Sequence, residues 1–310
     1  MNHLYRFMGT CTIAFILSCF VFMPFAYALP LPNTQLTVSE VFKLGVEEMR
    51  QGNYQGAITQ FTQAIQLQNN FANAYSNRCL AYLQIQFYQN AVTDCTQAIK
   101  ISPNNSEAYL NRGLAYQRQG NYQAAIADNN QVISIQTEDF RAYYNRGVAN
   151  AYLGNSLQAI EDYNTALSYT HQVSNTLIAD IYNERGLAYL QLTDQQTAIL
   201  NFNRAINIDS SNYRIYFNRG CAHAQIRDYW HAIDDFSQVV TLNPQEGDAY
   251  LNRGIAYHNL GYEQAAIADL HHASVHFEQQ GQQIAYKKTL NILKVVKQQI
   301  PDTVAIAMAW

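Results

Sequence analysis

The sequence predicts an all-α fold, a right-handed α-solenoid of seven helix–turn–helix units with a C-terminal capping helix. Three series of small residues predict it. The first is Gly45, Cys79, Gly113, Gly147, Gly186, Gly220 and Gly254, with successive spacings of 34, 34, 34, 39, 34 and 34 residues. The second is Ala57, Ala91, Ala125, Ala159, Ala198, Ala232 and Ala266, and the third is Ala64, Ala98, Val132, Ala166, Ala205, Val239 and Ala273. Because the three series keep one register over seven copies, they indicate an internal repeat.

Each copy divides into two helical patterns separated by a short turn. The turn reads Gly52-Asn53-Tyr54, Gly120-Asn121-Tyr122 or Gly261-Tyr262. Glycine or asparagine there permits the left-handed conformation that ends a helix. Copies end at turn-like residues, including Pro103 and Pro244, where a helix cannot continue. The small residues allow the two antiparallel helices to approach closely.

The third copy carries the repeat pattern in its clearest form. It reads Asn111-Arg112-Gly113-Leu114-Ala115-Tyr116, followed by Ala125-Ile126-Ala127-Asp128. This pattern resembles the tetratricopeptide repeat (TPR) family, whose 34-residue repeat has small, aromatic and alanine positions in the same order. The resemblance places seven repeats over residues 38–274 and implies a protein-binding scaffold. The Asn-Arg-Gly-x-Ala-Tyr form is similar to that of exported cyanobacterial members. Five extra residues around Thr170–Thr176 predict a longer loop between copies four and five.

The N-terminal segment, residues 1–28, predicts export. Phe7 to Met23 is almost entirely apolar, and Ala26-Tyr27-Ala28 suits cleavage by signal peptidase after Ala28. The alternative is an uncleaved membrane anchor, with attachment through residues 7–27. In either case the repeats are expected in a periplasm, a lumen or the extracellular space, or anchored and facing away from the cytoplasm. Residues 29–37 then form a proline-containing spacer.

The C-terminal part predicts a cap for the array. Residues 275–300 continue a helical pattern with an apolar side, and a solenoid needs its last apolar face covered. Gly281 lies where this helix could divide in two, and Pro301 ends it. Residues 301–310 form an apolar tail, which either folds back onto the array or meets a partner.

A recurring asparagine marks the first helix of most copies. The candidate peptide-binding residues are Asn77, Asn111, Asn145, Asn218 and Asn252, with Glu184 interrupting the series in copy five. An amide side chain can donate to and accept from a peptide unit at once. The series is similar to the asparagine ladder by which the repeats of O-linked N-acetylglucosamine transferase hold peptide backbone. The alternative is an asparagine bonded to a neighbouring repeat. The break at Glu184 predicts two binding tracts, copies two to four and copies six to seven.

A second series predicts structural ion pairs within each copy. The expected pairs are Arg78–Asp94, Arg112–Asp128, Arg146–Asp162, Arg219–Asp235 and Arg253–Asp269, while copy five has Arg185 with Asn201. Copy one has Leu44 and Gln60 at these positions, so the arginine and the carboxylate are absent together. This covariation within one chain indicates that the two residues touch. We interpret the pairs as part of the scaffold.

Other chemistry is not indicated by the sequence. A net charge of −4 disfavours generic nucleic-acid binding. His272 and His276 have the spacing of a helical metal pair, but no carboxylate completes a zincin-like motif, and a polar helix surface is the commoner reading. Cys79 and Cys95 could form a disulfide in an oxidising compartment, although buried thiols are the default expectation. We expect no catalytic residue, metal or cofactor.

These observations favour a non-catalytic scaffold that binds an extended peptide or a partner helix in a concave groove. Tyr143, Tyr144, Tyr216 and Phe217 are expected at or beside that groove. A clamp for acidic chaperone tails is disfavoured, because the positions flanking Asn77 lack the required cations. The alternative is a membrane-tethered assembly factor for a membrane complex, because Gln- and Asn-rich exported proteins of this type resemble those of photosynthetic bacteria.

Overall fold

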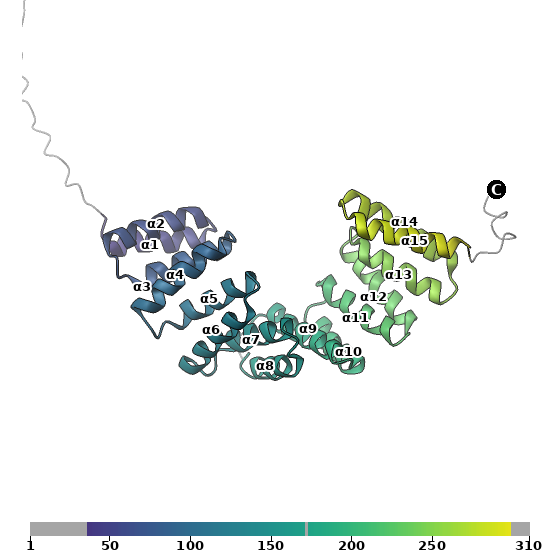
Figure 1. Cartoon of the computed structure of the whole chain (residues 1–310), viewed down its shortest axis with the longest axis horizontal. Coiled ribbons are helices and arrows are strands. Elements are labelled where there is room, and N and C mark those ends of the chain that lie inside the picture. The colour runs from purple at the N-terminus through teal and green to yellow at the C-terminus, as the bar shows by residue number, and fades with distance from the viewer. Residues whose placement is uncertain (1–35, 171–172, 299–310) are drawn as a thin grey trace, which may run out of the picture. The chain divides into compact units, whose positions relative to one another are not determined.

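The computed structural model describes residues 36–170 and 173–298, which form fifteen α-helices (Figure 1). The helices are α1 (Val38–Arg50), α2 (Tyr54–Leu67), α3 (Ala72–Gln84), α4 (Tyr88–Ile101), α5 (Ser106–Arg118), α6 (Tyr122–Ile135), α7 (Phe140–Tyr152), α8 (Ser156–Ser168), α9 (Asn175–Gln191), α10 (Gln195–Ile208), α11 (Tyr213–Gln225), α12 (Tyr229–Leu242), α13 (Gly247–Asn259), α14 (Glu263–Gln279) and α15 (Gln283–Gln298). None of them is long and apolar enough to cross a bilayer. The expected signal segment 1–28, most of the spacer 29–37 and the tail 301–310 lie outside the described residues.

Each copy is a pair of helices joined by a turn with one left-handed residue. Gly52, Gly120, Gly154 and Gly261 have φ between 76° and 81° at this position. The equivalent residues of the other copies are not glycine: they are Gln86, Thr193 and Arg227, with φ of 63°, 58° and 61°. After the turn, an asparagine or aspartate side chain often caps the second helix, as when Asn121 accepts a hydrogen bond from the backbone N–H of Ala124.

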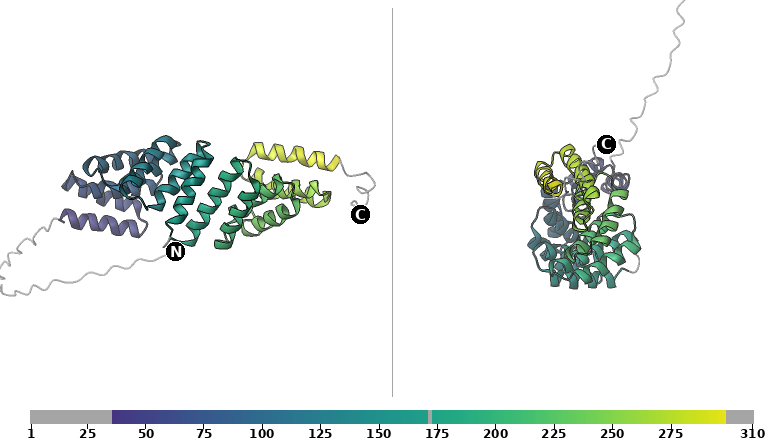
Figure 2. Two further views of the ribbon diagram at one scale, coloured as in Figure 1. Left: turned by 90° about the horizontal axis from the view of Figure 1, so that it is seen from below. Right: turned by 90° about the vertical axis from the view of Figure 1, so that its right-hand side faces the viewer.

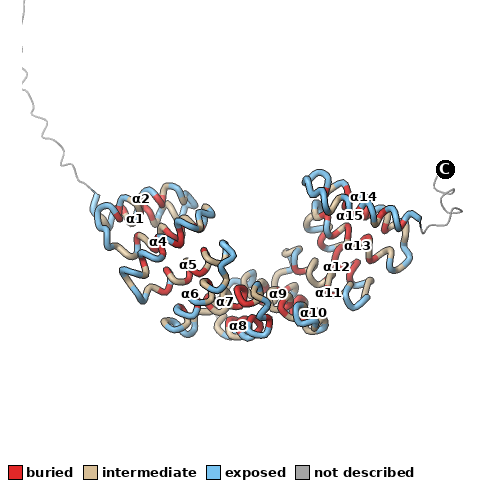
Figure 3. The backbone as a smooth tube through the Cα atoms, in the orientation of Figure 1, coloured by how far each residue is buried: buried red, intermediate tan, exposed pale blue. Residues whose placement is uncertain are grey.

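The three small-residue series form the interior of the helix pairs. Every member of all three series is buried, so the residues that predict the repeat are those where the two helices meet (Figure 3). The glycines make room for a large partner on the second helix. A Cβ atom at Gly186 would lie 2.6 Å from the Phe202 ring, and one at Gly147 would lie 2.7 Å from the Tyr163 ring. The predicted all-α solenoid is therefore confirmed, with its core distributed along the array.

Consecutive helices pack side by side along the array (Figure 2). In addition, each odd-numbered helix from α1 to α11 contacts the next odd-numbered helix. Within the described residues, no two even-numbered helices of neighbouring copies are in comparable contact. The first helices of the copies therefore lie closer together than the second helices. We call the surface that they form the inner surface.

The insertion between copies four and five mainly lengthens a helix. Helix α9 has 17 residues, whereas α7 and α11, the first helices of the adjacent copies, have 13. Four additional residues make about one turn of α-helix. The connection between Ser168 of α8 and Asn175 of α9 has six residues, whereas the other connections between copies have four, as between Ile135 and Phe140. The predicted longer loop is therefore present, but Asn175 and Thr176 of the predicted range belong to α9, and residues 171–172 lie outside the described residues.

The end of the array is covered by α15. Helix α14 runs to Gln279, so residues 275–279 of the expected capping segment belong to the last repeat helix. The chain then turns at Gly281, whose φ is 70°, and α15 begins at Gln283. Leu293 and Val296 of α15 are buried in one cluster with Leu270 and Phe277 of α14. The apolar face of the last pair is thus removed from water.

Candidate functional site

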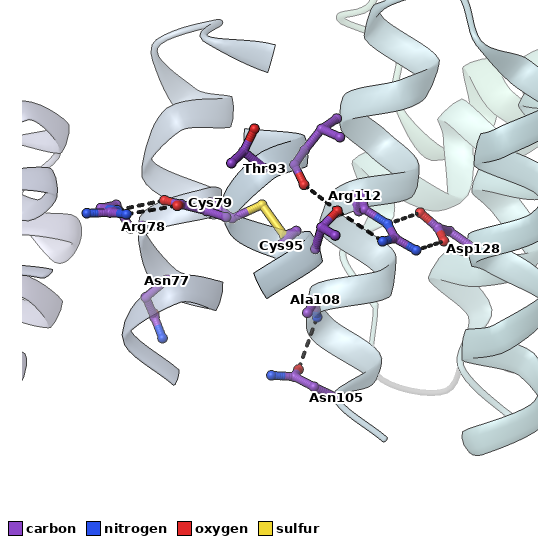
Figure 4. Close-up of a disulfide and its surroundings, with 12 residues drawn as sticks. Asn77, Arg78, Cys79, Thr93, Cys95, Asn105, Ala108, Arg112 and Asp128 are labelled. Atoms are coloured by element: carbon purple, nitrogen blue, oxygen red, sulfur yellow. Dashed lines mark hydrogen bonds and ion pairs between the residues drawn. A yellow bond between two sulfur atoms is a disulfide. The ribbon is translucent and has the colours of Figure 1, made fainter. Parts of the chain in front are cut away.

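The structure brings together the five expected arginine–aspartate pairs, each across the two helices of one copy. Their shortest N–O distances are 2.6 Å for Arg78–Asp94, 2.7 Å for Arg112–Asp128, 2.6 Å for Arg146–Asp162, 2.5 Å for Arg219–Asp235 and 2.7 Å for Arg253–Asp269. The pairing is bidentate, as Figure 4 shows for Arg112, whose Nε and Nη2 donate to the two oxygens of Asp128. The carboxylates are almost fully buried, so the pairs belong to the scaffold.

Each of these arginines also binds the preceding copy. Arg112 Nη1 donates to Thr96 on α4 at 3.1 Å, and Arg253 Nη1 donates to Ser237 on α12 at 3.0 Å. The other three acceptors are Thr62, Asn130 and Asn203, and Asn164 accepts in the same way from Arg185 of copy five. One guanidinium therefore joins three helices: its own, the second helix of its copy and the second helix of the preceding copy. Sequence reasoning missed this contact, although a Thr, Ser or Asn recurs 16 residues before each arginine outside the insertion.

Copy five lacks the carboxylate. Arg185 Nε donates to the amide oxygen of Asn201 at 2.7 Å, which replaces two bonds to an aspartate by one. Burial lowers the pKa of Arg185, whereas the hydrogen bond to Asp128 is the main cause of a raised pKa for Arg112. Copy five is thus the one place from copy two onward where a partly buried arginine has a neutral partner.

The asparagine series has three different environments on the inner surface. Asn77 and Asn252 each donate to a backbone carbonyl one turn earlier in their own helix, at 2.8 Å. Asn218 donates to the side chain of Asn183 on α9 at 2.9 Å, which is the alternative role considered for this series. Asn111 and Asn145 are partly exposed and make no hydrogen bond within the described residues. Their amides are therefore available to a ligand.

The inner surface is hollowed in copies four to seven, around the position where Glu184 interrupts the asparagine series. A groove of about 470 Å³ is formed by α7, α9, α11 and the start of α13. Its lining residues are Tyr144, Asp180, Asn183, Glu184, Leu187, Tyr213, Arg214, Phe217, Asn218, Glu246 and Asp248. We call this the inner groove. Of the aromatic residues expected at the groove, Tyr144 and Phe217 line it, while Tyr143 and Tyr216 stack beneath Arg146 and Arg219.

The inner groove is acidic. Four carboxylates line it, and Arg214 is its one cationic lining residue. Burial raises the pKa of Glu184 and of Asp180, and Arg214 opposes this only in part. The one hydrogen bond to Glu184 in the described part of the chain comes from Asn183, at 3.4 Å. Glu184, the residue that interrupts the asparagine series, is therefore a desolvated carboxylate without a close cation.

A second hollow continues from the inner groove. It has a volume of about 430 Å³, and Glu184 and Leu187 line both. Tyr163 on α8 has a fully buried side chain, and its hydroxyl has no hydrogen-bond partner among the described residues. The ring of Tyr163 packs near Tyr144, with 6.2 Å between the centroids. The Tyr163 hydroxyl is thus a buried polar group without a hydrogen-bond partner among the described residues.

Copy two contains a disulfide between Cys79 and Cys95 (Figure 4). These residues occupy the positions that a glycine and an aromatic residue share in copies four to six. The Cα atoms lie 5.5 Å apart, within the range that a disulfide spans. The default expectation of free thiols is therefore wrong, because the close approach of the two helices suits a bridge.

The histidines considered as a metal pair have another role. The rings of His272 and His276 both stack on Tyr250, at centroid distances of 5.3 Å and 5.4 Å. Both rings therefore pack against an aromatic residue of α13. Their helical spacing thus reflects packing between α13 and α14.

Paired helices with a buried seam, a hollowed inner surface and ion pairs within the scaffold define a helical repeat protein. The chain belongs to the tetratricopeptide repeat family. Family profiles described as TPR repeat or tetratricopeptide repeat match residues 45–86, 95–127, 140–170, 179–212 and 217–271. Proteins of this family generally mediate protein–protein interactions, and their repeats are generally non-catalytic. No curated protein matches the sequence.

Solved structures share the fold at low identity. A tetratricopeptide repeat protein from Parabacteroides merdae is 17% identical with a TM-score of 0.63, over 82% of this chain and 98% of that chain. The Pseudomonas aeruginosa protein pilF is 14% identical with a TM-score of 0.60, over 71% and 96%. YrrB, described as a TPR protein with an unusual peptide-binding site, is 18% identical with a TM-score of 0.50, over 64% and 97%.

Proposed function

We propose that this protein is a non-catalytic scaffold whose inner surface binds an extended peptide or a helix of a partner protein. The inner groove carries the proposal, because it combines apolar and aromatic walls with carboxylates at one place on the array. The bound segment presents lysine or arginine beside apolar side chains. The peptide-binding site described for YrrB supports such a use of the fold, although it belongs to that protein.

The charge of the groove determines the chemistry of the partner. Burial raises the pKa of Glu184, which means that its ionised form is destabilised where it stands. A cation from a partner would remove this cost by pairing with the carboxylate. Glu246 and Asp248, at the start of α13, continue the acidic lining of the groove on copy seven. Charge complementarity of this kind favours a basic segment and opposes an acidic one.

The apolar walls and the amides supply the remaining contacts. Tyr144, Leu187 and Phe217 offer surface for apolar side chains on either side of Glu184. Further along the inner surface, Asn111 and Asn145 have free amides that can bond to peptide backbone, which is independent of partner sequence. Asn77 and Asn252 retain a free amide oxygen as an acceptor. The proposed site therefore extends from copy two to copy seven, with selectivity concentrated at copy five.

A peptide-display selection against the full-length protein tests the charge of the partner. We expect the selected peptides to combine lysine or arginine with apolar residues. Fluorescence anisotropy of the best peptide should then show at least about ten-fold weaker binding to the Glu184→Gln variant, since a close charge pair in a protein interface contributes about 1.5 kcal/mol or more. Glu161→Gln is the matched control, because Glu161 is exposed on α8. Acidic peptides, or equal losses in both variants, would refute the proposal.

The contribution of the asparagine series is tested separately. The Asn111→Ala, Asn145→Ala double variant should bind the same peptide more weakly while keeping its helix content by circular dichroism. Asn259→Ala is the control, since Asn259 is an exposed asparagine that bonds to its own helix near the end of α13. Unchanged affinity in the double variant would remove the series from the site and leave the inner groove as the binding element.

We also propose that the repeats work outside the cytoplasm. The apolar segment at residues 7–23 supports this, and so does the disulfide, because such bonds persist mainly in oxidising compartments. The likeness to exported cyanobacterial members stays a prediction. Mass spectrometry of the protein from its native fractions distinguishes the two forms. Cleavage after Ala28 supports a free scaffold, whereas an intact N-terminus in membranes favours the tethered assembly factor.

A further inference from the structure

Two histidines and an aspartate converge at the turn of copy six. His223 lies near the end of α11, Asp228 caps the start of α12, and His231 lies in the first turn of α12. The Oδ2 atom of Asp228 is 3.3 Å from His223 Nδ1 and 2.7 Å from His231 Nδ1. One ligand atom from each residue lies within 4.8 Å of the others. This cluster is separate from the residues that line the inner groove.

The local backbone fixes the position of the carboxylate. The Asp228 N–H donates to the carbonyl of His223 at 2.9 Å, which closes the turn around the left-handed residue Arg227. Asp228 Oδ1 accepts from the His231 N–H as the helix cap, so Oδ2 remains directed toward the two imidazoles. The rings of His223 and His231 lie nearly parallel, with centroids 5.1 Å apart. The three side chains are thus held in place before any ligand arrives.

We propose that His223, Asp228 and His231 bind a divalent transition-metal cation of the Zn²⁺ or Cu²⁺ class. Two imidazole nitrogens and one carboxylate oxygen form a ligand set that such ions prefer over Mg²⁺ or Ca²⁺. The Asp228 Oδ2 atom lies 3.3 Å and 2.7 Å from the two imidazole nitrogens, which is within the span of about 4 Å that two ligands of one ion at about 2.0 Å can have. His231 is 67% exposed as a side chain, so water completes the coordination. The ion would join α11 to α12.

Two observations separate this site from a surface ion pair. The Nδ1 atom of His223 is buried and makes no hydrogen bond among the described residues, despite its distance from Asp228. In addition, the combination occurs in copy six alone. The position of His223 is tyrosine in four other copies, namely Tyr82, Tyr116, Tyr189 and Tyr257. The scaffold therefore does not require histidine there, and the nitrogen has no other role in the structure.

Isothermal titration of the full-length protein, without an affinity tag, with ZnCl₂ tests the site. We expect one strongly bound ion per chain. His223→Tyr restores the residue of the other copies and is therefore expected to fold, and it should weaken binding at least about ten-fold, as should His231→Ala. The control is the His272→Ala, His276→Ala double variant, whose histidines stack on Tyr250 and should not affect binding.

Quenching of tryptophan fluorescence by CuCl₂ gives an independent readout. Trp230 lies between Asp228 and His231 in the sequence, and the only other tryptophan is Trp310, which a Trp310→Phe background removes. Stoichiometric quenching that is lost in His223→Tyr would support the site. The proposal is overturned if Zn²⁺ does not bind in a one-to-one ratio, or if His223→Tyr binds as tightly as the unaltered protein.

Discussion

Exchanging the residues at positions 128 and 201 tests the role of the interior ion pairs most sharply. Asp128 and Asn201 occupy the same place in copies three and five, and both are about 4% exposed. Asp128 accepts two hydrogen bonds from Arg112, at 2.9 Å and 2.7 Å, whereas Asn201 accepts one from Arg185 at 2.7 Å. Asp128→Asn therefore converts copy three to the form of copy five, and Asn201→Asp does the reverse.

The two exchanges are not expected to be equal and opposite. Asp128→Asn removes one hydrogen bond to a charged group, worth about 1.5–3 kcal/mol. It also relieves the desolvation that raises the pKa of Asp128, so the net loss should be about 1–2 kcal/mol. Asn201→Asp gains the second bond to Arg185 but loses the bond that the Asn201 amide donates to Thr197, at 2.7 Å. Its net gain should be smaller, about 0–1 kcal/mol.

Because a repeat array can unfold in parts, the assay should be local. Native-state hydrogen exchange should show faster exchange in α5 and α6 of Asp128→Asn, and unchanged or slower exchange in α9 and α10 of Asn201→Asp. Urea denaturation of the same proteins gives the direction of the global change. Unaltered exchange in α5 and α6 of Asp128→Asn would refute the reasoning. Faster exchange in α9 and α10 of Asn201→Asp would refute it as well.

Three further predictions follow from individual residues. Reduction of the Cys79–Cys95 bridge, whose cysteines are separated by 16 positions, should lower the free energy of unfolding by about 3 kcal/mol. The Cys79→Gly, Cys95→Phe variant should recover part of this loss through the glycine–phenylalanine packing seen in copy six, whereas equal urea midpoints with and without reductant would contradict the prediction. Thr193→Gly should raise the free energy of unfolding by about 0.5–1 kcal/mol, because a β-branched residue at φ of 58° is strained. A lower urea midpoint for the variant would contradict this, because it would show that the contacts of the threonine side chain outweigh the backbone strain. Glu184→Gln should stabilise the protein at pH 7 but not near pH 4. Burial raises the folded-state pKa of Glu184, so its ionisation costs stability as the pH rises from the unfolded-state pKa of about 4.3 through the folded-state pKa. Equal changes in the free energy of unfolding at both pH values would contradict this.

The fold could be predicted because its core is built from positions that recur. The glycine and alanine series lie where two helices meet, so their spacing in the sequence equals the spacing of the helix pairs. The arginine–aspartate pairs were accessible for the same reason, since their covariation reports a contact within one copy. Contacts between copies were harder to predict. The bond from Arg112 to Thr96 involves a residue type that is common on helix surfaces, so its recurrence carries little signal alone.

The candidate site was predicted less well because it depends on departures from the repeat. Asn218 looked equivalent to Asn111, yet it bonds to Asn183, which is available only because copy five differs from its neighbours. Glu184 was interpreted as a gap in the asparagine series, whereas it lines the inner groove together with Tyr144, Leu187 and Phe217. The metal-like cluster was also missed, because His223, Asp228 and His231 come together only through the turn that separates α11 from α12.

Site-specific cross-linking of the selected basic peptide tests the central claim most directly. A photoreactive amino acid is placed at Leu187, which lines the inner groove, or at Leu200, which is 59% exposed on α10. Binding at the inner groove predicts a cross-link from position 187 that excess unlabelled peptide abolishes, and none from position 200. A cross-link from position 200, or none from position 187 at saturating peptide, would contradict it.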